Sequence, residues 1–387
     1  MEYQGVTVRE PDQTRSRYAP LALDEAPEVG AVLTRLGLGE FDPGDVTTRV
    51  GRNDNWSGTT STGARVFVKR LGGPWPLEAR QRYDRILSFE SLIACHPRAE
   101  LLGPRLLGCD ADSLIVVFEL LEDARSGSEL AADGEFDEEL CHHAGQLTAH
   151  LHNLPPDGDV LDTTPHPMPP PHPHNAITLE GFIASTFGEL ETWRLVQSDL
   201  EVVAALRGLR EAESALDDKR PIHGDLRRDQ FLWTPQQLYL TDWEELRLGD
   251  PARDVGAVIG EWLYSAVHSV PRRIFEAADT RLDHEASHEE VLAHGIQEVD
   301  RLRPRMRAFW AGYTSVRGAA AADGLRTRAA AYAGWHMFDR MLATATASGY
   351  VYAADRAGAG IGRAILLSPD SFADTLGLDA LELGETQ

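Results

Sequence analysis

Two aspartates and one glutamine in the middle of the chain are the residues best suited to chemistry. Asp225 and Asp242 lie 17 positions apart, each beside a short apolar run. The segments Phe231–Trp233 and Leu238–Leu240 are rich in strand-forming residues, and the Pro-containing polar stretch between them is typical of a turn. A hairpin carries its two ends to one place, so Asp225, Gln230 and Asp242 should surround one small volume. A proton acceptor, an amide oxygen and a metal-binding carboxylate together are the groups that phosphoryl transfer requires.

The order and spacing of these residues resemble the catalytic loop of kinases. In that loop, His-x-Asp is followed five positions after the Asp by Asn, and a metal-binding Asp comes after a hairpin. This chain has His-Gly-Asp at 223–225, Gln230 at the five-on position and Asp-Trp-Glu at 242–244. That version, followed by Gly-Asp-Pro-x-x-Asp at 249–254, resembles the aminoglycoside phosphotransferase and choline kinase families.

The resemblance implies ATP and Mg²⁺ as cofactors and suggests a role for each residue. Asp225 would take the proton of the acceptor hydroxyl, and Asp242 would hold Mg²⁺ with the help of Gln230. The family has Asn where this chain has Gln230, which offers the same amide oxygen on a side chain one methylene longer. Arg227, two positions after Asp225, would place a cation near the γ-phosphate, and a surface arginine is an equally good interpretation of that residue.

A strand-rich zone near the N-terminus carries a lysine that composition singles out. Strands are expected at Val46–Gly51, Trp56–Thr60 and Arg65–Leu71, separated by polar turns. The third contains Lys69, one of only two lysines among 37 basic residues. An ammonium is a compact point charge and a guanidinium a wide fork, so a narrow site between phosphates favours lysine. By resemblance to the kinase strand with the same pattern, Lys69 would bind the α- and β-phosphates.

Two further features of this first part fit a nucleotide site. A helix is expected over Leu77–Ile93, and within it Glu90 is the candidate to orient Lys69, with Glu78 as its rival. The apolar strand Ser113–Leu121 would lead into a hinge, where backbone groups at Glu119 and Leu121 would bind the adenine edge. A buried strand leading to an ordinary loop is equally consistent with this stretch.

The sequence therefore predicts an α+β, bilobal protein-kinase-like fold. Residues 1–121 would form a lobe with a small antiparallel sheet, and residues 122–387 a mostly helical lobe with a Pro-rich insertion at 155–175. That insertion is expected to be a loop or linker, either mobile or packed on the surface of the second lobe. Helices are expected at Glu25–Gly37, Phe136–His152, Leu190–Leu216, Val255–Val267, Ile296–Tyr313 and Leu325–Ala347.

Composition narrows the setting. No apolar run approaches the roughly 18 residues of a membrane span, and the N-terminus lacks the basic head and apolar core of a secretory signal. Three scattered cysteines suggest reduced thiols and a cytoplasmic protein. The net charge of −24 argues against nucleic acid and membrane as partners. This negative charge would suit a cationic partner, and the alternative is that it only keeps the protein soluble.

The phosphate acceptor depends on a finer resemblance. The segments Gly51–Trp56 and Asp229–Leu232 are similar to the kinase subunits of split lanthipeptide and thioamitide dehydratases. That similarity implies a Ser or Thr acceptor in a ribosomal precursor peptide and a partner lyase that eliminates the phosphate. The alternatives are a kinase for a small-molecule hydroxyl, such as an aminoglycoside or macrolide, and a pseudokinase that scaffolds a partner enzyme.

Overall fold

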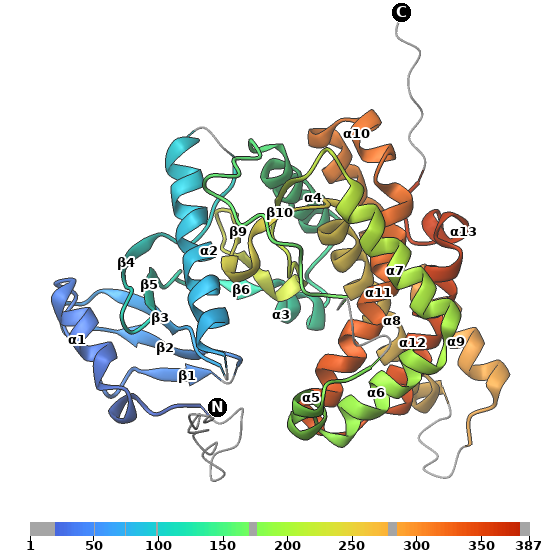
Figure 1. Cartoon of the computed structure of the whole chain (residues 1–387), viewed down its shortest axis with the longest axis horizontal. Coiled ribbons are helices and arrows are strands. Elements are labelled where there is room, and N and C mark those ends of the chain that lie inside the picture. Colours follow the sequence, from blue (N-terminus) through green and yellow to red (C-terminus); the bar gives the residue numbers. More distant parts are fainter. Residues whose placement is uncertain are drawn as a thin grey trace, which may run out of the picture. The chain divides into compact units, whose positions relative to one another are not determined.

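The structure is a computed structural model that describes residues 20–49, 51–73, 75–97, 100–169, 176–277 and 285–379 (Figure 1). Its contacts divide the chain into two compact units. The smaller unit contains the described residues up to Tyr83 together with Arg105–Leu121, and the larger contains Asp84–Pro104 and the described residues from Glu122 onward. The smaller has an antiparallel sheet and the larger is mostly helical, which confirms the predicted α+β fold class.

The smaller unit is built on a five-stranded antiparallel sheet in the order β1-β2-β3-β5-β4. Its strands are β1 (Thr47–Arg49), β2 (Asp54–Thr59), β3 (Arg65–Arg70), β4 (Leu106–Asp110) and β5 (Ile115–Glu119). One face packs against helix α1 (Pro27–Arg35) through a core that includes Trp56, Val66, Val68, Val29 and Leu33. The sequence missed β4, because every residue of that strand is half-buried and no alternation marks it.

Helix α2 (Pro76–Cys95) is divided between the two units. Its ring Phe89 stacks on Trp243 with centroids 3.7 Å apart, and Arg85 pairs with Asp162 at 2.8 Å. These contacts explain why residues 84–104 cluster with the larger unit, whereas the sequence had assigned them to the first lobe. The chain passes from one unit to the other after Tyr83, after Pro104 and after Leu121.

The larger unit surrounds two small sheets with helices. Its strands are β6 (Arg125–Ser126), β7 (Arg220–Ile222), β8 (Phe231–Trp233), β9 (Leu238–Leu240) and β10 (Arg247–Gly249). Its helices are α3 (Gly127–Ala132), α4 (Glu138–Asn153), α5 (Leu179–Ala184), α6 (Phe187–Ser198), α7 (Leu200–Ala215), α8 (Ala252–Ala277), α9 (His288–Arg317), α10 (Ala319–Asp323), α11 (Arg326–Ser348), α12 (Ala353–Leu367) and α13 (Pro369–Ala373). Figure 1 shows α8, α9 and α11 as the long helices of this part of the chain.

The prediction of one helix over Leu190–Leu216 is wrong. The chain forms α6 and α7, separated by Asp199, whose backbone is extended at φ −105° and ψ 94°. The Asp199 carboxylate accepts the N–H of Val202 at 3.2 Å, so it caps the second helix. The apolar periodicity runs through the break, which is why the pattern alone did not reveal it.

Helices α4 and α9 cross at very short range. A Cβ atom at Gly145 would lie 2.0 Å from the Phe309 carbonyl oxygen, and one at Gly312 would lie 1.9 Å from that of His142. Only glycine allows two backbones to approach this closely. The crossing therefore fixes the position of α4, which carries His152 of the candidate site.

Part of the Pro-rich segment packs firmly on the larger unit. The N–H of Leu248 donates to the Asp162 carbonyl at 2.9 Å, and Arg210 donates to the carbonyls of His166 and Pro169 at 3.0 and 2.5 Å. Residues 170–175 lie outside the described part. Among the described residues, no helix combines the length and apolar character needed to cross a membrane.

Candidate active site

The predicted hairpin is present and joins two of the candidate residues. Strands β8 and β9 pair antiparallel, with Phe231 opposite Leu240. Directly beyond that pair, the N–H of Thr241 donates to the Gln230 carbonyl at 3.0 Å. Gln230 is buried, with 4% of its surface exposed, and Asp242 is half-buried. The hairpin thus places an amide and a carboxylate side chain at its open end.

His223 connects the two ends of the candidate site. Its ring is buried, and Nε2 lies 2.8 Å from the Thr241 carbonyl oxygen, so Nε2 carries the proton and donates. The ring also packs against Trp243, with centroids 5.1 Å apart. Asp242 between them has a left-handed backbone at φ 72°. His223 therefore orients the segment that holds Asp242, and it lies two residues before Asp225 in the chain.

Asp254 anchors the segment that precedes Asp225. This fully buried carboxylate accepts the N–H groups of His223 and Gly224 at 2.7 and 3.0 Å, and Nε2 of His152 at 3.1 Å. Burial would raise the pKa of Asp254, but these hydrogen bonds hold it below its ordinary value. Gly224 has φ +84°, and a Cβ there would lie 2.5 Å from the Glu245 carbonyl oxygen, so glycine is required.

Asp225 is a partly exposed carboxylate beside an arginine. Its side chain is 43% exposed, and its Oδ2 lies 3.5 Å from Nη1 of Arg227. Loss of surrounding water raises the pKa of Asp225 to about 6, against the lowering effect of Arg227 and together with the negative charge of Asp339. Arg227 is also held by Asp229 through bonds of 3.1 and 3.2 Å. Burial would lower the pKa of Arg227, but the two carboxylates keep it above its ordinary value.

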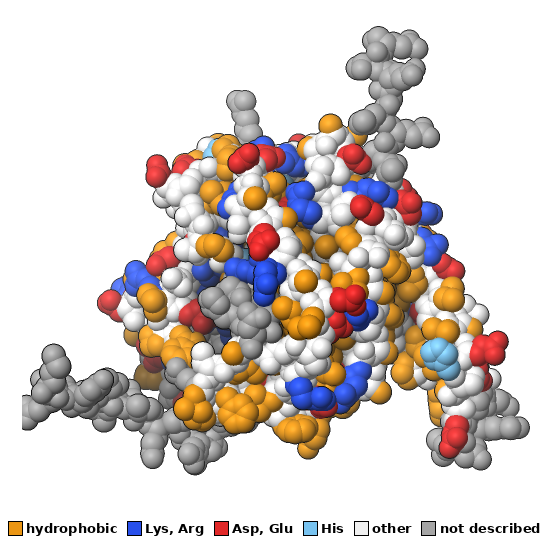
Figure 2. Space-filling model, turned by 45° about the vertical axis from the view of Figure 1, so that its right-hand side comes forward, with side chains coloured by type: hydrophobic (Ala, Val, Ile, Leu, Met, Phe, Trp, Pro, Cys, Tyr) orange, Lys and Arg blue, Asp and Glu red, His pale blue; other side chains and the backbone are white. Residues whose placement is uncertain are grey.

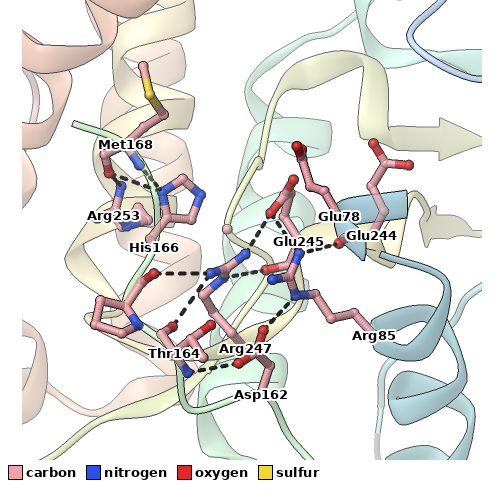
Figure 3. A network of polar contacts seen from close by, with 12 residues as sticks. Glu78, Arg85, Asp162, Thr164, His166, Met168, Glu244, Glu245, Arg247 and Arg253 are labelled. Atoms are coloured by element: carbon pink, nitrogen blue, oxygen red, sulfur yellow. Dashed lines mark hydrogen bonds and ion pairs between the residues drawn. The ribbon is translucent and has the colours of Figure 1, made fainter. Parts of the chain in front are cut away.

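A buried polar network supports the segment that follows Asp242 (Figure 3). Arg85 donates to Asp162 at 2.8 Å and to Glu245 at 3.3 Å, and Arg247 donates to the same Glu245 carboxylate at 2.6 Å. The Arg247 guanidinium also lies 3.5 Å from the Thr164 carbonyl oxygen. Burial lowers the pKa of Arg247 to about 10, so it remains charged at neutral pH. The network therefore joins helix α2 to the Pro-rich segment and to the segment that follows the hairpin.

The same view shows why His166 is a structural residue (Figure 3). Its Nδ1 accepts the N–H of Met168 at 3.0 Å, and Arg253 donates to the Met168 carbonyl at 2.7 Å. Burial, reinforced by the charge of Arg253, holds the pKa of His166 well below its usual range, so the ring is neutral.

Within the described ranges, no group of three or more His, Cys, Asp or Glu residues could hold a metal ion.

Lys69 lies on the smaller unit, on the sheet face opposite the α1 core. It is buried, with 7% of its surface exposed, and faces Asn55 of β2 and Val116 of β5 in the register. Among the carboxylates proposed to orient it, Glu78 forms an exposed ion pair with Arg52. Glu90 is half-buried, and burial raises its pKa. Glu90 belongs to the larger unit, and its pairing with Lys69 stays a prediction.

The proposed adenine hinge follows β5. The N–H of Glu119 donates to the Arg105 carbonyl at 2.9 Å, and that of Leu120 to the Arg65 carbonyl at 3.1 Å. Both groups are committed to the sheet. Leu121 is the first residue beyond them and is half-buried. A role of Glu119 and Leu121 in binding adenine remains a prediction.

Sequence reasoning missed several residues around these positions. Asp229 fixes Arg227, and Asp339 of α11 is close enough to influence Asp225. Neither has a local sequence signal, because the contacts depend on how distant segments fold together. Asn55 could have been found, since counting outward from the turn between β2 and β3 places it directly opposite Lys69.

A family model described as "Phosphotransferase enzyme family" matches residues 49–293, which is more than half of the 387 residues. The chain belongs to this family. This confirms the predicted enzyme class, a kinase that acts on a hydroxyl acceptor. No curated protein matches the chain.

Two solved structures are similar in fold. The amicoumacin kinase hAmiN, in complex with AMP-PNP, Ca²⁺ and Ami, has a TM-score of 0.51 and 11% identity, over 89% of this chain and 96% of that one. A choline/ethanolamine kinase family protein from Mesorhizobium loti has a TM-score of 0.50 and 15% identity, over 92% of this chain and 99% of that one. These similarities confirm the protein-kinase-like fold.

Proposed function

We propose that this phosphotransferase moves the γ-phosphoryl group of ATP, bound with Mg²⁺, to an acceptor hydroxyl beside Asp225. The observation that carries the proposal is the hairpin end, where the Thr241 N–H bonds the Gln230 carbonyl at 3.0 Å and so brings Gln230 next to Asp242. One carboxylate and one amide oxygen suit Mg²⁺, which takes oxygen ligands and usually only one or two carboxylates beside the substrate phosphates. Bound there, Mg²⁺ would neutralise phosphate charge.

The chain's own residues would then position and deprotonate the acceptor. With a pKa of about 6, Asp225 is mostly ionised at neutral pH and is a stronger base than an ordinary aspartate. As the acceptor oxygen bonds to the γ-phosphorus and the bond to the leaving ADP oxygen breaks, the hydroxyl proton passes to Asp225. Arg227 would stabilise charge beside it, and Lys69 would bind the α- and β-phosphates, with Glu90 orienting that lysine.

The acceptor that we propose is a Ser or Thr of a ribosomal precursor peptide, whose phosphate a partner lyase then eliminates. The similarity of residues 51–56 and 229–232 to the kinase subunits of split dehydratases supports this choice. A peptide also needs accessible apolar surface, and α5, the start of α6 and the loop after α11 expose large hydrophobic side chains. These are Leu179, Phe182, Ile183, Phe187, Tyr350 and Tyr352.

Two of the three elements that carry these exposed residues are in contact. A Cβ atom at Gly188, next to Phe187, would lie 2.7 Å from the backbone nitrogen of Tyr350, so α6 touches the loop after α11. The face drawn in Figure 2 mixes acidic, basic and hydrophobic side chains. The charge of −24 is thus not gathered into one acidic patch on that face.

A second candidate is a kinase for a cationic small molecule. The observation that favours it is Asp339, whose negative charge reaches Asp225 and which is 27% exposed. Asp339 also pairs with Arg340 at 3.3 Å, so an ammonium group, such as those of aminoglycosides, would share this second carboxylate with Arg340. The two candidates share Asp225, Gln230 and Asp242 and differ only in what binds beside them.

Mass spectrometry separates the candidates. The protein is incubated with ATP and Mg²⁺ and either a candidate precursor peptide or a panel of aminoglycosides and macrolides, with Asp225→Asn as the inactive control. A peptide that gains one phosphate, and loses it when a lyase is added, supports the peptide acceptor. A phosphorylated antibiotic beside unmodified peptide overturns it in favour of the second candidate.

Isothermal titration with ATP, with and without Mg²⁺, tests the common step. Mg²⁺-dependent binding supports the proposal, and absence of binding in both conditions refutes it. Binding without transfer to any acceptor would favour the pseudokinase alternative. The need for ATP and the three free cysteines fit the predicted cytoplasmic location.

A further inference from the structure

One buried amide oxygen in the smaller unit has no partner, and it belongs to the residue opposite Lys69. The register of β2 and β3 places Asn55 directly across from Lys69. Side chains of opposed residues lie on the same face, with Cβ atoms roughly 4.5–5.5 Å apart. Within the described part of the chain, nothing donates a hydrogen bond to Oδ1 of Asn55.

The orientation of the Asn55 amide is fixed from its other end. Its Nδ2 donates to the Asn53 carbonyl at 3.0 Å. Asn53 is itself clamped, because its Oδ1 accepts Nη1 of the buried Arg82 at 2.7 Å. Arg82 also donates to the carbonyl of Gly72, just beyond β3. These hydrogen bonds of Arg82 attach the loop before β2 to the end of β3. Because the Asn53 carbonyl is held in this way, Oδ1 of Asn55 cannot rotate away unless the hydrogen bond from Nδ2 to that carbonyl breaks.

The neighbouring carboxylate is directed away from this face. Asp54 alternates with Asn55 along β2, and its carboxylate pairs with Arg70 at 2.6 Å, next to the α1 core. Arg70 also pairs with Glu28 of α1. Asn55 therefore provides the acceptor that β2 presents opposite Lys69.

Hydrogen-bonding chemistry identifies the missing partner. A carboxamide oxygen only accepts, and a lysine ammonium has three hydrogens and only donates. Phosphate oxygens cannot be the partner of Asn55 Oδ1, because they also only accept hydrogen bonds. A buried acceptor left without a partner is costly, so the working state of the site should provide a donor. Lys69, the residue opposite Asn55 in the register, carries such a donor.

We propose that Asn55 is a positioning residue for Lys69, whose ammonium donates to Asn55 Oδ1 when nucleotide is bound. The remaining ammonium hydrogens then serve the phosphates and the orienting carboxylate. This inference rests on the proposed function. It adds a requirement that the family's catalytic-loop pattern does not contain, namely an acceptor on β2 that holds the lysine from the side.

A double-mutant cycle on ATP affinity tests the pair. Isothermal titration of Mg²⁺ and AMP-PNP is run on the wild type, Asn55→Leu, Lys69→Met and the double variant. Asn55→Leu should weaken binding roughly ten- to a hundredfold, as expected for a hydrogen bond to a charged group. The same change in the Lys69→Met background should alter affinity less than twofold. Ser57→Ala, on the same face of β2 two residues away, is the matched control and should also stay within twofold.

A spectroscopic readout follows the contact without enzyme activity. With only Lys69 and Lys219 in the chain, ¹⁵N-lysine labelling gives two ammonium signals. The Lys69 signal should become protected from solvent exchange on adding Mg²⁺ and AMP-PNP in the wild type and in Ser57→Ala, and should lose that protection in Asn55→Leu. If Asn55→Leu fails to fold, Asn55→Ala removes the same acceptor with a smaller side chain and should likewise lose the protection of the Lys69 signal.

The outcomes are distinguishable. If Asn55→Leu weakens binding equally with and without Lys69, or leaves affinity and protection unchanged, the positioning role is wrong while nucleotide binding stands. If the wild type binds no nucleotide, the proposed function is overturned, and the nucleotide-dependent contact with it.

Discussion

Replacing Asp254 by Asn should damage both stability and catalysis, and the structure gives the size of the effect. Asp254 Oδ2 accepts His223 N–H and His152 Nε2, and Oδ1 accepts Gly224 N–H. An Asn can keep its oxygen where Oδ2 of Asp254 accepts the His223 N–H. Its NH₂ group then takes the place of Oδ1 and faces the Gly224 N–H, so that two donors meet. The variant loses one hydrogen bond to a charged acceptor, about 1.5–3 kcal/mol, and buries unpaired donors at about 1–3 kcal/mol. Unfolding of the larger unit should therefore become easier by roughly 3–5 kcal/mol.

The catalytic effect follows from the same geometry. Because the His223–Gly224 backbone holds Asp225 in place, a displaced loop should lower kcat more than it changes nucleotide affinity. Denaturant titration followed by tryptophan fluorescence gives the stability change, and single-turnover kinetics below the unfolding transition gives the rate. Asp250→Asn is the matched control, since Asp250 is equally buried but pairs with Arg328 at 2.6 Å. It should destabilise the protein and leave the rate of the folded fraction almost unchanged. The reasoning would be refuted if Asp254→Asn had a free energy of unfolding within 1 kcal/mol of the wild type and a single-turnover rate within threefold of it.

Four further predictions concern the candidate residues. Asp225→Asn should lower turnover by about 10²–10⁴-fold and leave ATP affinity within a few-fold, as titration would show; near-normal turnover would rule it out as the base. Because the pKa of Asp225 is raised to about 6 and only its ionised form accepts a proton, kcat/KM should fall as the pH drops through about 6, and a flat pH profile between 5 and 8 would contradict this. Lys69→Arg should lose most activity because a planar fork does not fit a point-charge site, with a thermal midpoint near that of the wild type; an active variant would contradict the lysine argument. Gln230→Leu should raise the Mg²⁺ concentration needed for half-maximal nucleotide binding several-fold, and an unchanged Mg²⁺ dependence would remove Gln230 from the metal site.

The sequence predicted the parts of the structure that short-range signals determine. The hairpin occurs at the expected residues, because two strand-forming triplets flank a Pro-containing turn and its register follows from the turn. Lys69 lies on a strand for the same reason, at the end of the apolar run Val66–Val68 between two turns. The break at Asp199 was invisible because an aspartate inside a periodic apolar pattern is usually a solvated side chain, and its capping role depends on the backbone it adopts.

Contacts between distant segments could not be predicted in this way. Arg85 and Glu245 are 160 positions apart, and their pairing depends on the packing of α2, the Pro-rich segment and the post-hairpin segment at once. The same limit explains why residues 84–104 were assigned to the first lobe. The helix was recognised, but periodicity does not say which unit its buried face contacts, and the stacking of Phe89 on Trp243 decides that.

The dependence of the catalytic segment on α11 has a consequence for protein synthesis. Glu261 lies 3.5 Å from Arg228 of the loop and bonds His336 of α11, 75 positions later in the sequence. A ribosome releases residues 223–242 well before it releases the helix that supports them. During that interval the nascent chain carries every residue of the catalytic motif but not the packing that arranges them. Phosphoryl transfer can therefore begin only when the C-terminal helices have emerged, and an mRNA truncated before α11 would yield an inert product despite an intact motif.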